Sequence, residues 1–262
     1  MITSMANPQI KEVVALRSGS KARRKAGLFV VEGRRLTEEV PADMIRKLYV
    51  TEAFAASAEG MRLCEQFCGR TETVSEAVFA KMADTDTPQG VLAVVKQPSY
   101  TPEQLCGGNR GNSLLLCEHV QDPGNMGTLF RTAEAAGFGG IILDRESADP
   151  LQPKTVRSTM GAIYRLPFYV TDDPAAVLEQ LHGLGYRSYA AHLGGEKYYD
   201  EIQYPEKIVF LLGNEGNGLS DRLTAAASEK LRIPMEGQAE SLNVAVAGAV
   251  LMYERYRRLR QG

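Results

Sequence analysis

This sequence has few cysteines and no long hydrophobic run. Its four cysteines are too sparse for a disulfide scaffold and lack the C-x-x-C spacing that zinc sites usually show, so we expect no metal. Cys64 and Cys68 are four apart in a helical pattern, which predicts a neighbouring pair of buried thiols. The longest apolar stretch, 242–252, contains Asn243 and Gly248, which excludes a membrane span.

Targeting signals and extremes of composition are also lacking. Residues 1–8 have neither the charged start nor the apolar core of a signal peptide, so we expect a cytoplasmic protein. Hydrophobic residues make up 44% of the chain and charged residues 24%, which excludes disordered and collagen-like proteins. At roughly 150 residues per domain, the length of 262 residues suggests two domains that each bury a core.

The net charge is only −2, but a basic cluster lies near the N-terminus. Residues 11–35 contain eight lysines and arginines against two glutamates. This cluster is either a solvated helix face or an electrostatic surface for the backbone of a nucleic acid. The segment alone favours neither alternative.

The hydrophobic pattern predicts a small α/β domain in the first hundred residues. The expected helices are 8–17, 54–67 and 75–82, and the expected strands are 28–32, 48–51 and 91–95. The segment 97–112 is rich in proline, glycine and asparagine and is the best candidate for a linker. We therefore expect one domain at 1–106 and a second at 107–262.

The pattern of the second domain predicts a mostly parallel sheet with helices on both faces. The expected strands are 113–118, 140–143, 167–170, 187–191 and 207–212, and the expected helices are 125–137, 174–184, 220–227 and 241–260. Ligands of such sheets bind in the loops that follow the carboxyl ends of the strands. Three loops in such positions carry polar residues and glycines.

The first of these loops joins a strand to a helix through the turn Asp122-Pro-Gly. We expect Asn125 to cap the helix and Arg131, nearly two turns further on, to lie on the same side. A capped helix N-terminus beside an arginine is suited to an anion such as phosphate. The alternative is an ordinary helix with a solvated arginine, but the small residues in Arg131-Thr-Ala-Glu-Ala-Ala-Gly indicate close packing around Arg131.

The second loop is Gly213-Asn-Glu-Gly-Asn-Gly-Leu, after an apolar strand. Its glycines allow the backbone to approach a ligand closely. It is not a P-loop, because no lysine follows the last glycine, and it is not the dinucleotide fingerprint G-x-G-x-x-G. The alternative is a glycine-rich hairpin, which leaves Glu215 unexplained.

The third loop, 233–243, is an extended segment and a turn that lead into a long helix. We expect Ser241 to cap this helix. Asn243 would lie in its first turn, where the amide either faces a ligand or supports the cap.

Together, the three loops resemble the three motifs of the SpoU (TrmH-like) RNA ribose 2′-O-methyltransferases of the SPOUT superfamily. The matching residues are Asn125-x-Gly with Arg131-Thr-Ala-Glu-Ala-Ala-Gly, Leu212-Gly-Asn-Glu-Gly-Asn-Gly-Leu, and Ile233-Pro-Met with Ser241-Leu-Asn-Val. Arg157-Ser-Thr-Met-Gly-Ala resembles a segment between the motifs. Leu28-Phe-Val-Val-Glu-Gly-Arg resembles the small L30e/L7Ae-like α/β domain that precedes the catalytic domain in many members.

The resemblance implies a homodimeric enzyme with a deep C-terminal trefoil knot that binds S-adenosylmethionine. Catalytic roles are implied for Asn125, Arg131, Glu215, Ser241 and Asn243, and cofactor contacts are implied for Gly213, Asn214, Gly216, Ile233, Met235 and Leu242. The segment 192–195 would border the methionine end of the cofactor. Ala245 departs from the family, because members often have serine there.

The implied reaction is methylation of a ribose 2′-hydroxyl, with 23S ribosomal RNA favoured as substrate. RNA contacts are expected from Lys21, Arg23, Arg24, Lys25, Arg34 and Arg35 in the basic cluster. One alternative is a tRNA 2′-O-methyltransferase, and another is a non-catalytic RNA-binding or ribosome-assembly protein with a vestigial cofactor site. A nucleotide-dependent enzyme is disfavoured because the chain lacks both nucleotide fingerprints.

Overall fold

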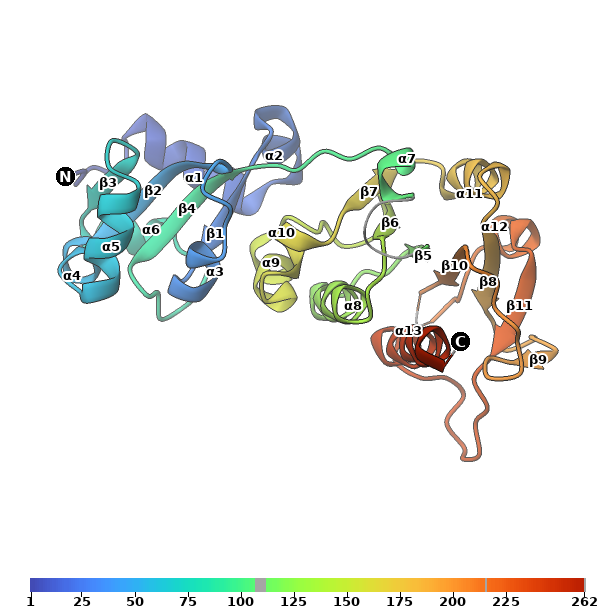
Figure 1. The fold of residues 1–262 in the computed structure, drawn as a ribbon. Coiled ribbons are helices and arrows are strands. Elements are labelled where there is room, and N and C mark those ends of the chain that lie inside the picture. Colours follow the sequence, from blue (N-terminus) through green and yellow to red (C-terminus); the bar gives the residue numbers. More distant parts are fainter. Residues whose placement is uncertain (107–111, 215, 262) are drawn as a thin grey trace. The chain divides into compact units, whose positions relative to one another are not determined.

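The computed structural model describes residues 1–106, 112–214 and 216–261 (Figure 1). The chain forms two compact units: the first unit is Met1–Pro98 with Asp149–Tyr164, and the second unit is Ser99–Ala148 with Arg165–Gly262. The first unit thus includes a segment from the middle of the expected catalytic domain. The functional division into 1–106 and 107–262 stays a prediction, and linker residues 107–111 lie outside the described residues.

The first unit contains a four-stranded mixed sheet in the order β1-β4-β2-β3. Strand β4 is antiparallel to β1 and β2, whereas β2 and β3 are parallel. The strands are β1 (Leu28–Glu32), β2 (Ile45–Thr51), β3 (Thr71–Val74) and β4 (Val91–Lys96). The helices are α1 (Pro8–Ser18), α2 (Ser20–Ala26), α3 (Arg34–Glu38), α4 (Glu52–Ala55), α5 (Ala58–Gln66), α6 (Glu76–Met82), α9 (Pro153–Thr159) and α10 (Ala162–Arg165), whose last residue belongs to the second unit.

One core of the first unit forms where α1 and α6 pack on the sheet. Apolar residues three apart on α1, Val13 and Leu16, bury one face of that helix. They join Phe79 of α6 and alternating strand residues such as Leu28 and Val30. The apolar faces of these helices and strands thus pack into a single cluster.

Two local predictions for the first unit are wrong. The helix expected at 54–67 is divided into α4 and α5, because Ser57 accepts a hydrogen bond from the N–H of Gly60 (3.0 Å) and starts a new helix. Helix α5 ends at Gln66, so Cys68 leaves the helical face that Cys64 occupies. Cys64 is half-buried and Cys68 is exposed, and they are not a pair of buried thiols.

The second unit is built on a seven-stranded sheet in the order β7-β6-β5-β10-β8-β11-β9, with all strand pairs parallel. The strands are β5 (Ser113–Cys117), β6 (Gly140–Asp144), β7 (Phe168–Thr171), β8 (Arg187–Ala191), β9 (Lys197–Tyr198), β10 (Ile208–Leu212) and β11 (Glu229–Arg232). The helices are α7 (Pro102–Leu105), α8 (Pro123–Ala135), α11 (Pro174–Gly183), α12 (Asp221–Ala226) and α13 (Val244–Gln261). The predicted mostly parallel α/β architecture is confirmed.

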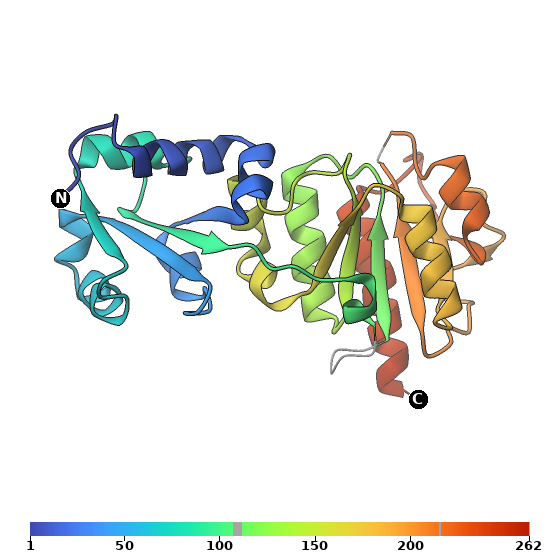
Figure 2. The ribbon, with the colours of Figure 1, turned by 90° about the horizontal axis from the view of Figure 1, so that it is seen from above.

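Helices cover both faces of this sheet, as Figure 2 shows: α8 and α13 lie on one face, and α11 and α12 on the other. Every residue of β5 and β10 is buried, as expected for parallel strands between two helical layers. These two strands are neighbours, and the strand order runs outward from them in opposite directions. Such a switch point leaves a crevice beyond the carboxyl ends of the strands.

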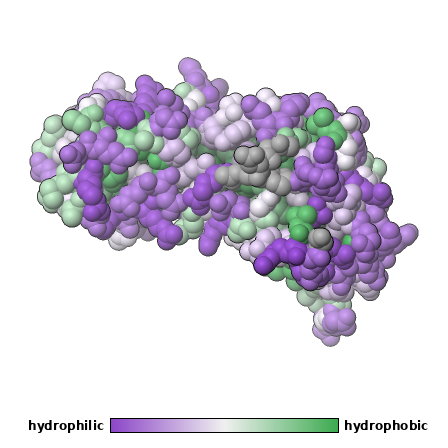
Figure 3. Space-filling view, in the orientation of Figure 1, coloured by the Kyte–Doolittle hydropathy of each residue, from purple (hydrophilic) through white to green (hydrophobic). Residues whose placement is uncertain are grey.

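The surface shown in Figure 3 is mostly hydrophilic, as expected when most apolar residues are buried in the core. On the face shown in Figure 3, hydrophilic side chains predominate and the hydrophobic ones form separate patches. Within the part of the chain that the structure describes, no helix combines the length and apolar character needed to cross a membrane.

The basic cluster contains one arginine with an internal role. Arg23 on α2 is 4% exposed, and its Nη2 lies 2.6 Å from Oδ2 of Asp149. Its Nη1 donates to the backbone carbonyls of Leu16 and Arg17 at 2.7 and 3.1 Å. The RNA contact expected for Arg23 is therefore wrong, because a buried, fully engaged guanidinium is unavailable to a phosphate.

We predict that Arg23→Ala lowers the free energy of unfolding by about 2 kcal/mol, because Asp149 loses its partner while partly desolvated. Arg24→Ala, at the exposed neighbour on the same helix, should change it by less than about 0.5 kcal/mol. Thermal unfolding of both variants measures the difference. Equal stability of the two variants would contradict a structural role for Arg23.

Candidate functional site

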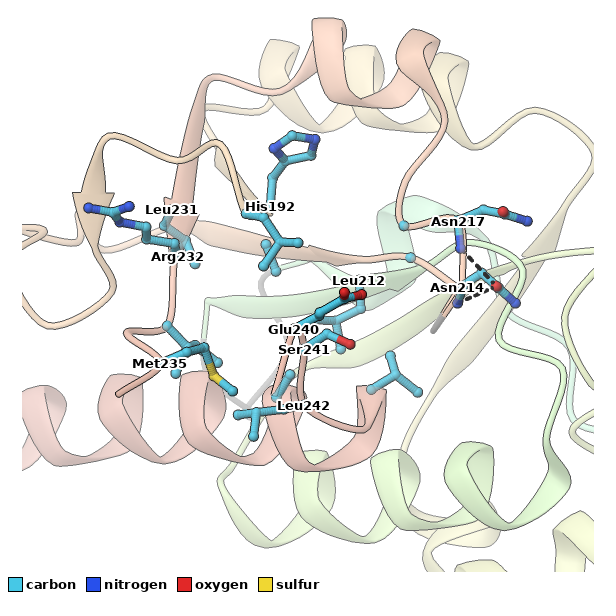
Figure 4. A pocket seen from close by; sticks show the side chains of 18 residues that line it. His192, Leu212, Asn214, Asn217, Leu231, Arg232, Met235, Glu240, Ser241 and Leu242 are labelled. Carbon is cyan, nitrogen blue, oxygen red and sulfur yellow. Dashed lines mark hydrogen bonds between the residues drawn. The ribbon is translucent and has the colours of Figure 1, made fainter. Parts of the chain in front are cut away.

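A pocket of about 360 Å³ lies beyond the carboxyl ends of β8, β10 and β11 (Figure 4). All six residues expected to contact the cofactor line it: Gly213, Asn214, Gly216, Ile233, Met235 and Leu242. Ser241 lines it as well, whereas Asn125, Arg131 and Asn243 do not. Two loops that are separated in the sequence, one after β10 and one after β11, thus form its opposite walls.

One wall is the glycine loop, defined here by its described residues Gly213, Asn214 and 216–219. A Cβ atom on Gly213 would lie 2.1 Å from the carbonyl carbon of Gly218, so no side chain fits there. The backbones of Asn214 and Gly218 exchange two hydrogen bonds at 3.0 and 2.9 Å, which close the loop. Gly218 has φ +68°, a conformation that favours glycine.

The side chain of Asn214 is used inside the loop. Its Oδ1 accepts hydrogen bonds from the N–H groups of Gly216 (2.8 Å) and Asn217 (3.2 Å), as Figure 4 shows. Its Nδ2 donates to the backbone carbonyl of His119 (3.0 Å). A ligand in the pocket therefore meets the loop mainly through its backbone.

The opposite wall comes from the third loop and the start of α13. In Figure 4, Met235 lies at the lower left and Leu242 at the bottom, across the pocket from the glycine loop at the right. Ser241 lies between Leu242 and Leu212. The ring of His192 points away from these residues, and its Nδ1 accepts from the N–H of Gly194 (2.9 Å). The segment 192–195 thus borders the pocket through its backbone and Leu193.

Both helix caps expected at the site are displaced. Helix α8 starts at Pro123 with Asp122 as its cap, because Asp122 Oδ1 accepts from the N–H of Asn125 (2.8 Å). Helix α13 starts at Val244, and its first turn is capped by Asn243, whose Oδ1 accepts from Ala245 N (3.0 Å) and Val246 N (3.3 Å). Asn125 and Ser241 are therefore not caps.

The displaced caps bring two predicted catalytic residues together. Nδ2 of Asn243 donates to Oδ1 of Asn125 at 3.0 Å, across 118 residues of sequence. The two helices also pack closely: a Cβ on Gly248 of α13 would lie 2.5 Å from Cδ2 of Leu129 on α8. The amide pair thus ties the N-terminal ends of α8 and α13 together.

The other predicted catalytic residues are less constrained. Arg131 is exposed on α8, and its side chain makes no hydrogen bond or ion pair with the residues that the structure describes. The close packing expected around it is formed by Ala133 and Ala136, which are buried, and does not involve the guanidinium. Glu215 lies outside the described residues.

The other five basic residues expected to contact RNA fall into two groups. Lys21, Arg24 and Lys25 of α2 are exposed. Arg34 and Arg35 are exposed too, but they form surface ion pairs with Glu59 (2.7 Å) and Glu39 (3.3 Å), which contribute little stability. All five remain accessible to a polyanion.

Glu240 also lines the pocket, with its carboxylate beside Ser241 in Figure 4, and was not expected from the sequence. Its position within the third loop was the only signal that could have indicated it. Among residues 1–106, 112–214 and 216–261, no group of three or more histidine, cysteine or acidic side chains is arranged to hold a metal ion.

Two family models match the chain. Residues 112–253 match the model of the SpoU rRNA Methylase family, and residues 7–93 match the MRM3-like substrate binding domain. The chain belongs to the SpoU rRNA methylase family. The resemblance carried by the three loops is thus confirmed, and the SpoU match includes residues 149–164, which fold with the first unit.

Relatives of known name and structure cover nearly all of the chain. The 23S rRNA (guanosine(2553)-2′-O)-methyltransferase RlmP of Bacillus subtilis is 33% identical, over 96% of this chain and 97% of its own. The SpoU methyltransferase AviRb from Streptomyces viridochromogenes, in complex with AdoMet, is 26% identical with a TM-score of 0.87, over 98% and 99% of the two chains. An AdoMet-bound rRNA methyltransferase from Sinorhizobium meliloti is 31% identical with a TM-score of 0.84, over 98% and 97%.

The displaced cap gives a direct test of the geometry at the start of α13. Asn243→Ala should lower the free energy of unfolding by about 1–2 kcal/mol, because it removes the cap of α13 and the bond to Asn125. Ser241→Ala should cost less than about 0.5 kcal/mol, because Ser241 is exposed and caps no helix. Denaturant unfolding measures both, and a larger effect at Ser241 would contradict this assignment.

Proposed function

We propose that this SpoU-family chain transfers the methyl group of S-adenosylmethionine to a ribose 2′-hydroxyl of 23S ribosomal RNA. The observation that carries the proposal is one arrangement in the second unit: a glycine-walled pocket beside the amide pair of Asn125 and Asn243. Relatives of this chain are named for 2′-O-methylation of 23S rRNA or were solved with AdoMet.

The pocket residues fit S-adenosylmethionine. Its volume of about 360 Å³ lies in the range of small-molecule sites. Leu212, Ile233 and Leu242 supply apolar walls for an adenine ring, and the glycine loop supplies backbone groups for its polar edge. We propose direct cofactor contacts for Gly213, Asn214, Gly216, Ile233, Met235 and Leu242, with Asn214 acting through its backbone.

Bound there, S-adenosylmethionine supplies an electrophilic sulfonium methyl group with a good thioether leaving group. The protein must then place the ribose 2′-oxygen in line and help to remove its proton. Asn125, Ser241 and Asn243 offer amide and hydroxyl groups that orient the hydroxyl and the methionine end. The hydrogen bond between the two asparagines supports this role, because it holds one amide against the other.

We assign Arg131 to charge stabilisation. A guanidinium stays protonated in proteins and is a poor base, but it pairs well with a phosphate and with developing alkoxide charge. Its exposure on α8, free of internal partners among the described residues, supports contact with RNA. Glu215 keeps the role expected from the sequence, as proton acceptor or as ion-pair partner of Arg131.

We also propose the finer architecture that the resemblance implies: a deep C-terminal trefoil knot, an L30e-like first domain and a homodimer. The contribution of the third loop and the glycine loop to one pocket supports the knot. Exposed apolar side chains on α13 support a covered face, with Val246 and Tyr253 each 49% exposed and Leu259 54% exposed. We place the protein in the cytoplasm with its RNA.

Arg131→Ala should reduce methyl transfer by about 100-fold or more while cofactor binding is retained. The reason is that Arg131 would stabilise the negative charge that develops on the ribose oxygen and would bind the neighbouring RNA phosphate. The assay is transfer of label from S-adenosylmethionine to total RNA of bacteria that lack this enzyme, followed by mapping of alkali-resistant dinucleotides.

Arg187→Ala is the control, because Arg187 is exposed at the start of β8, the opposite end of the sheet from the pocket. It should transfer label at the wild-type rate. Turnover by Arg131→Ala within a few-fold of wild type would contradict the role assigned to Arg131. Label in transfer RNA alone would contradict the ribosomal substrate. RNA binding without cofactor binding would indicate a non-catalytic RNA-binding protein.

Replacing Lys21, Arg24 and Lys25 together by alanine should weaken RNA binding and reduce the slope of log Kd against log salt by about 2, because fewer phosphate counterions are released. Affinity for S-adenosylmethionine should not change, because none of these residues lines the pocket. Titration of RNA at several salt concentrations measures the slope. An unchanged slope would show that these three residues do not contact RNA phosphates.

A further inference from the structure

Two buried acids in the second unit have no part in the proposed reaction. Glu118 follows β5 and Asp144 ends β6, and each residue is 5% exposed. Buried carboxylates are costly unless hydrogen bonds satisfy them. Their partners therefore indicate what they are retained for.

Glu118 binds Ser220, the residue that directly follows the glycine loop. Its Oε2 accepts from the backbone N–H of Ser220 at 2.6 Å, and its Oε1 accepts from the Ser220 hydroxyl at 2.7 Å. Ser220 Oγ in turn accepts from the N–H of Leu223 and starts α12. The backbone N–H of Glu118 donates to the carbonyl of Leu212 (2.9 Å), so Glu118 reaches both the residue before the loop and the residue after it.

Asp144 stabilises the backbone conformation of His119, the residue that binds Asn214 near the start of the glycine loop. His119 has φ +57°, an uncommon conformation for a residue other than glycine. Asp144 supports this conformation, because its Oδ1 accepts from the His119 N–H (3.0 Å) and its Oδ2 lies 3.1 Å from His119 Nε2. The N–H and hydroxyl of Ser147 also donate to Oδ1 of Asp144, at 3.0 and 2.5 Å, which anchors the carboxylate.

The conformation of His119 determines where its carbonyl points. That carbonyl accepts the hydrogen bond from Nδ2 of Asn214, and Oδ1 of the same amide accepts from the N–H groups of Gly216 and Asn217. Asp144 is thus connected to the pocket wall through His119 and Asn214. The contacts of Glu118 and Asp144 reach opposite ends of the same loop.

We propose that Glu118 and Asp144 are positioning residues that hold the glycine loop in the shape that binds S-adenosylmethionine. This inference rests on the proposed cofactor pocket. Neither carboxylate lines that pocket, so both act through other residues: Glu118 through Ser220, and Asp144 through His119 and Asn214. Loss of either should weaken cofactor binding and leave the chemical step almost unchanged.

The first test is Glu118→Gln, which leaves one neutral amide oxygen for the two donors of Ser220 that the two carboxylate oxygens now accept from. We expect the Kd for S-adenosylmethionine, measured by calorimetry on the full chain, to rise about tenfold, as for a lost hydrogen bond to a charged group. The KM for S-adenosylmethionine should rise in parallel, while kcat at saturation stays within about twofold of wild type. Hydrogen exchange should speed up at the Ser220 N–H.

Glu32→Gln is the matched control. Glu32 ends β1 in the first unit, is 6% exposed, and accepts from the backbone N–H of Asp84 (2.6 Å) and the hydroxyl of Thr85. The same change therefore removes the same kind of contact far from the glycine loop in sequence. It should lower thermal stability comparably and leave the Kd for S-adenosylmethionine at the wild-type value.

Asp144 gives an independent test that stays decisive if Glu118→Gln does not fold. Asp144→Ala should raise the Kd for S-adenosylmethionine about tenfold. Asp144→Asn should bring it back to within about threefold of wild type, because the amide oxygen still accepts from the His119 N–H. Rescue by asparagine is not expected if only the buried charge matters.

Several outcomes would overturn the inference. These are wild-type affinity in folded Glu118→Gln and Asp144→Ala, an equal loss of affinity in Glu32→Gln, or a fall in kcat with unchanged Kd. Failure of the proposed function is distinguishable, because the wild type itself would then not bind S-adenosylmethionine, or Gly213→Ala, whose Cβ collides with Gly218, would bind it normally.

Discussion

The pairing of β5 with β10 is the constraint on which the rest of the site depends. The two strands are parallel neighbours at the centre of the sheet, in register from Ile208 opposite Ser113 to Leu212 opposite Cys117. Their carboxyl ends therefore lie side by side, which brings the first and second sequence motifs together over about 90 residues of chain. Because both strands are buried, a shift of register would expose apolar residues, so burial maintains the geometry of the site.

Helix α13 adds the third motif to that edge. Its close contact with α8 and β10 requires Gly248, since a Cβ there would lie 2.5 Å from Leu129 and 2.9 Å from Leu212. That contact holds the N-terminal part of α13 against α8, where Asn243 reaches Asn125. The site is therefore a consequence of helix packing as much as of the loops themselves.

Several polar side chains at this edge combine a structural role with a proposed functional one. Asn243 caps a helix and bonds to another proposed catalytic amide, and Asn214 organises the pocket wall through hydrogen bonds to both sides. Such sharing makes the site rigid, because each amide is held in place by backbone groups of more than one segment. Arg131 is the exception: it is exposed, which agrees with the RNA contact that we propose for it.

The sequence by itself determined most of the strands, the α/β class, the family and the residues of the pocket, because buried parallel strands are continuous apolar runs and the glycine loop follows one of them directly. It did not indicate β3, β9 or β11. It did not determine the start of α13, the exposure of Cys68 or the burial of Arg23, and it gave no sign of Glu118 as a support. The burial of Arg23 and the contacts of Glu118 depend on partners that only folding brings near: Asp149 lies 126 residues from Arg23, and Ser220 lies 102 residues from Glu118. Local pattern predicts what a segment prefers, whereas desolvation and hydrogen bonding between distant segments decide which polar side chains are buried and what they hold.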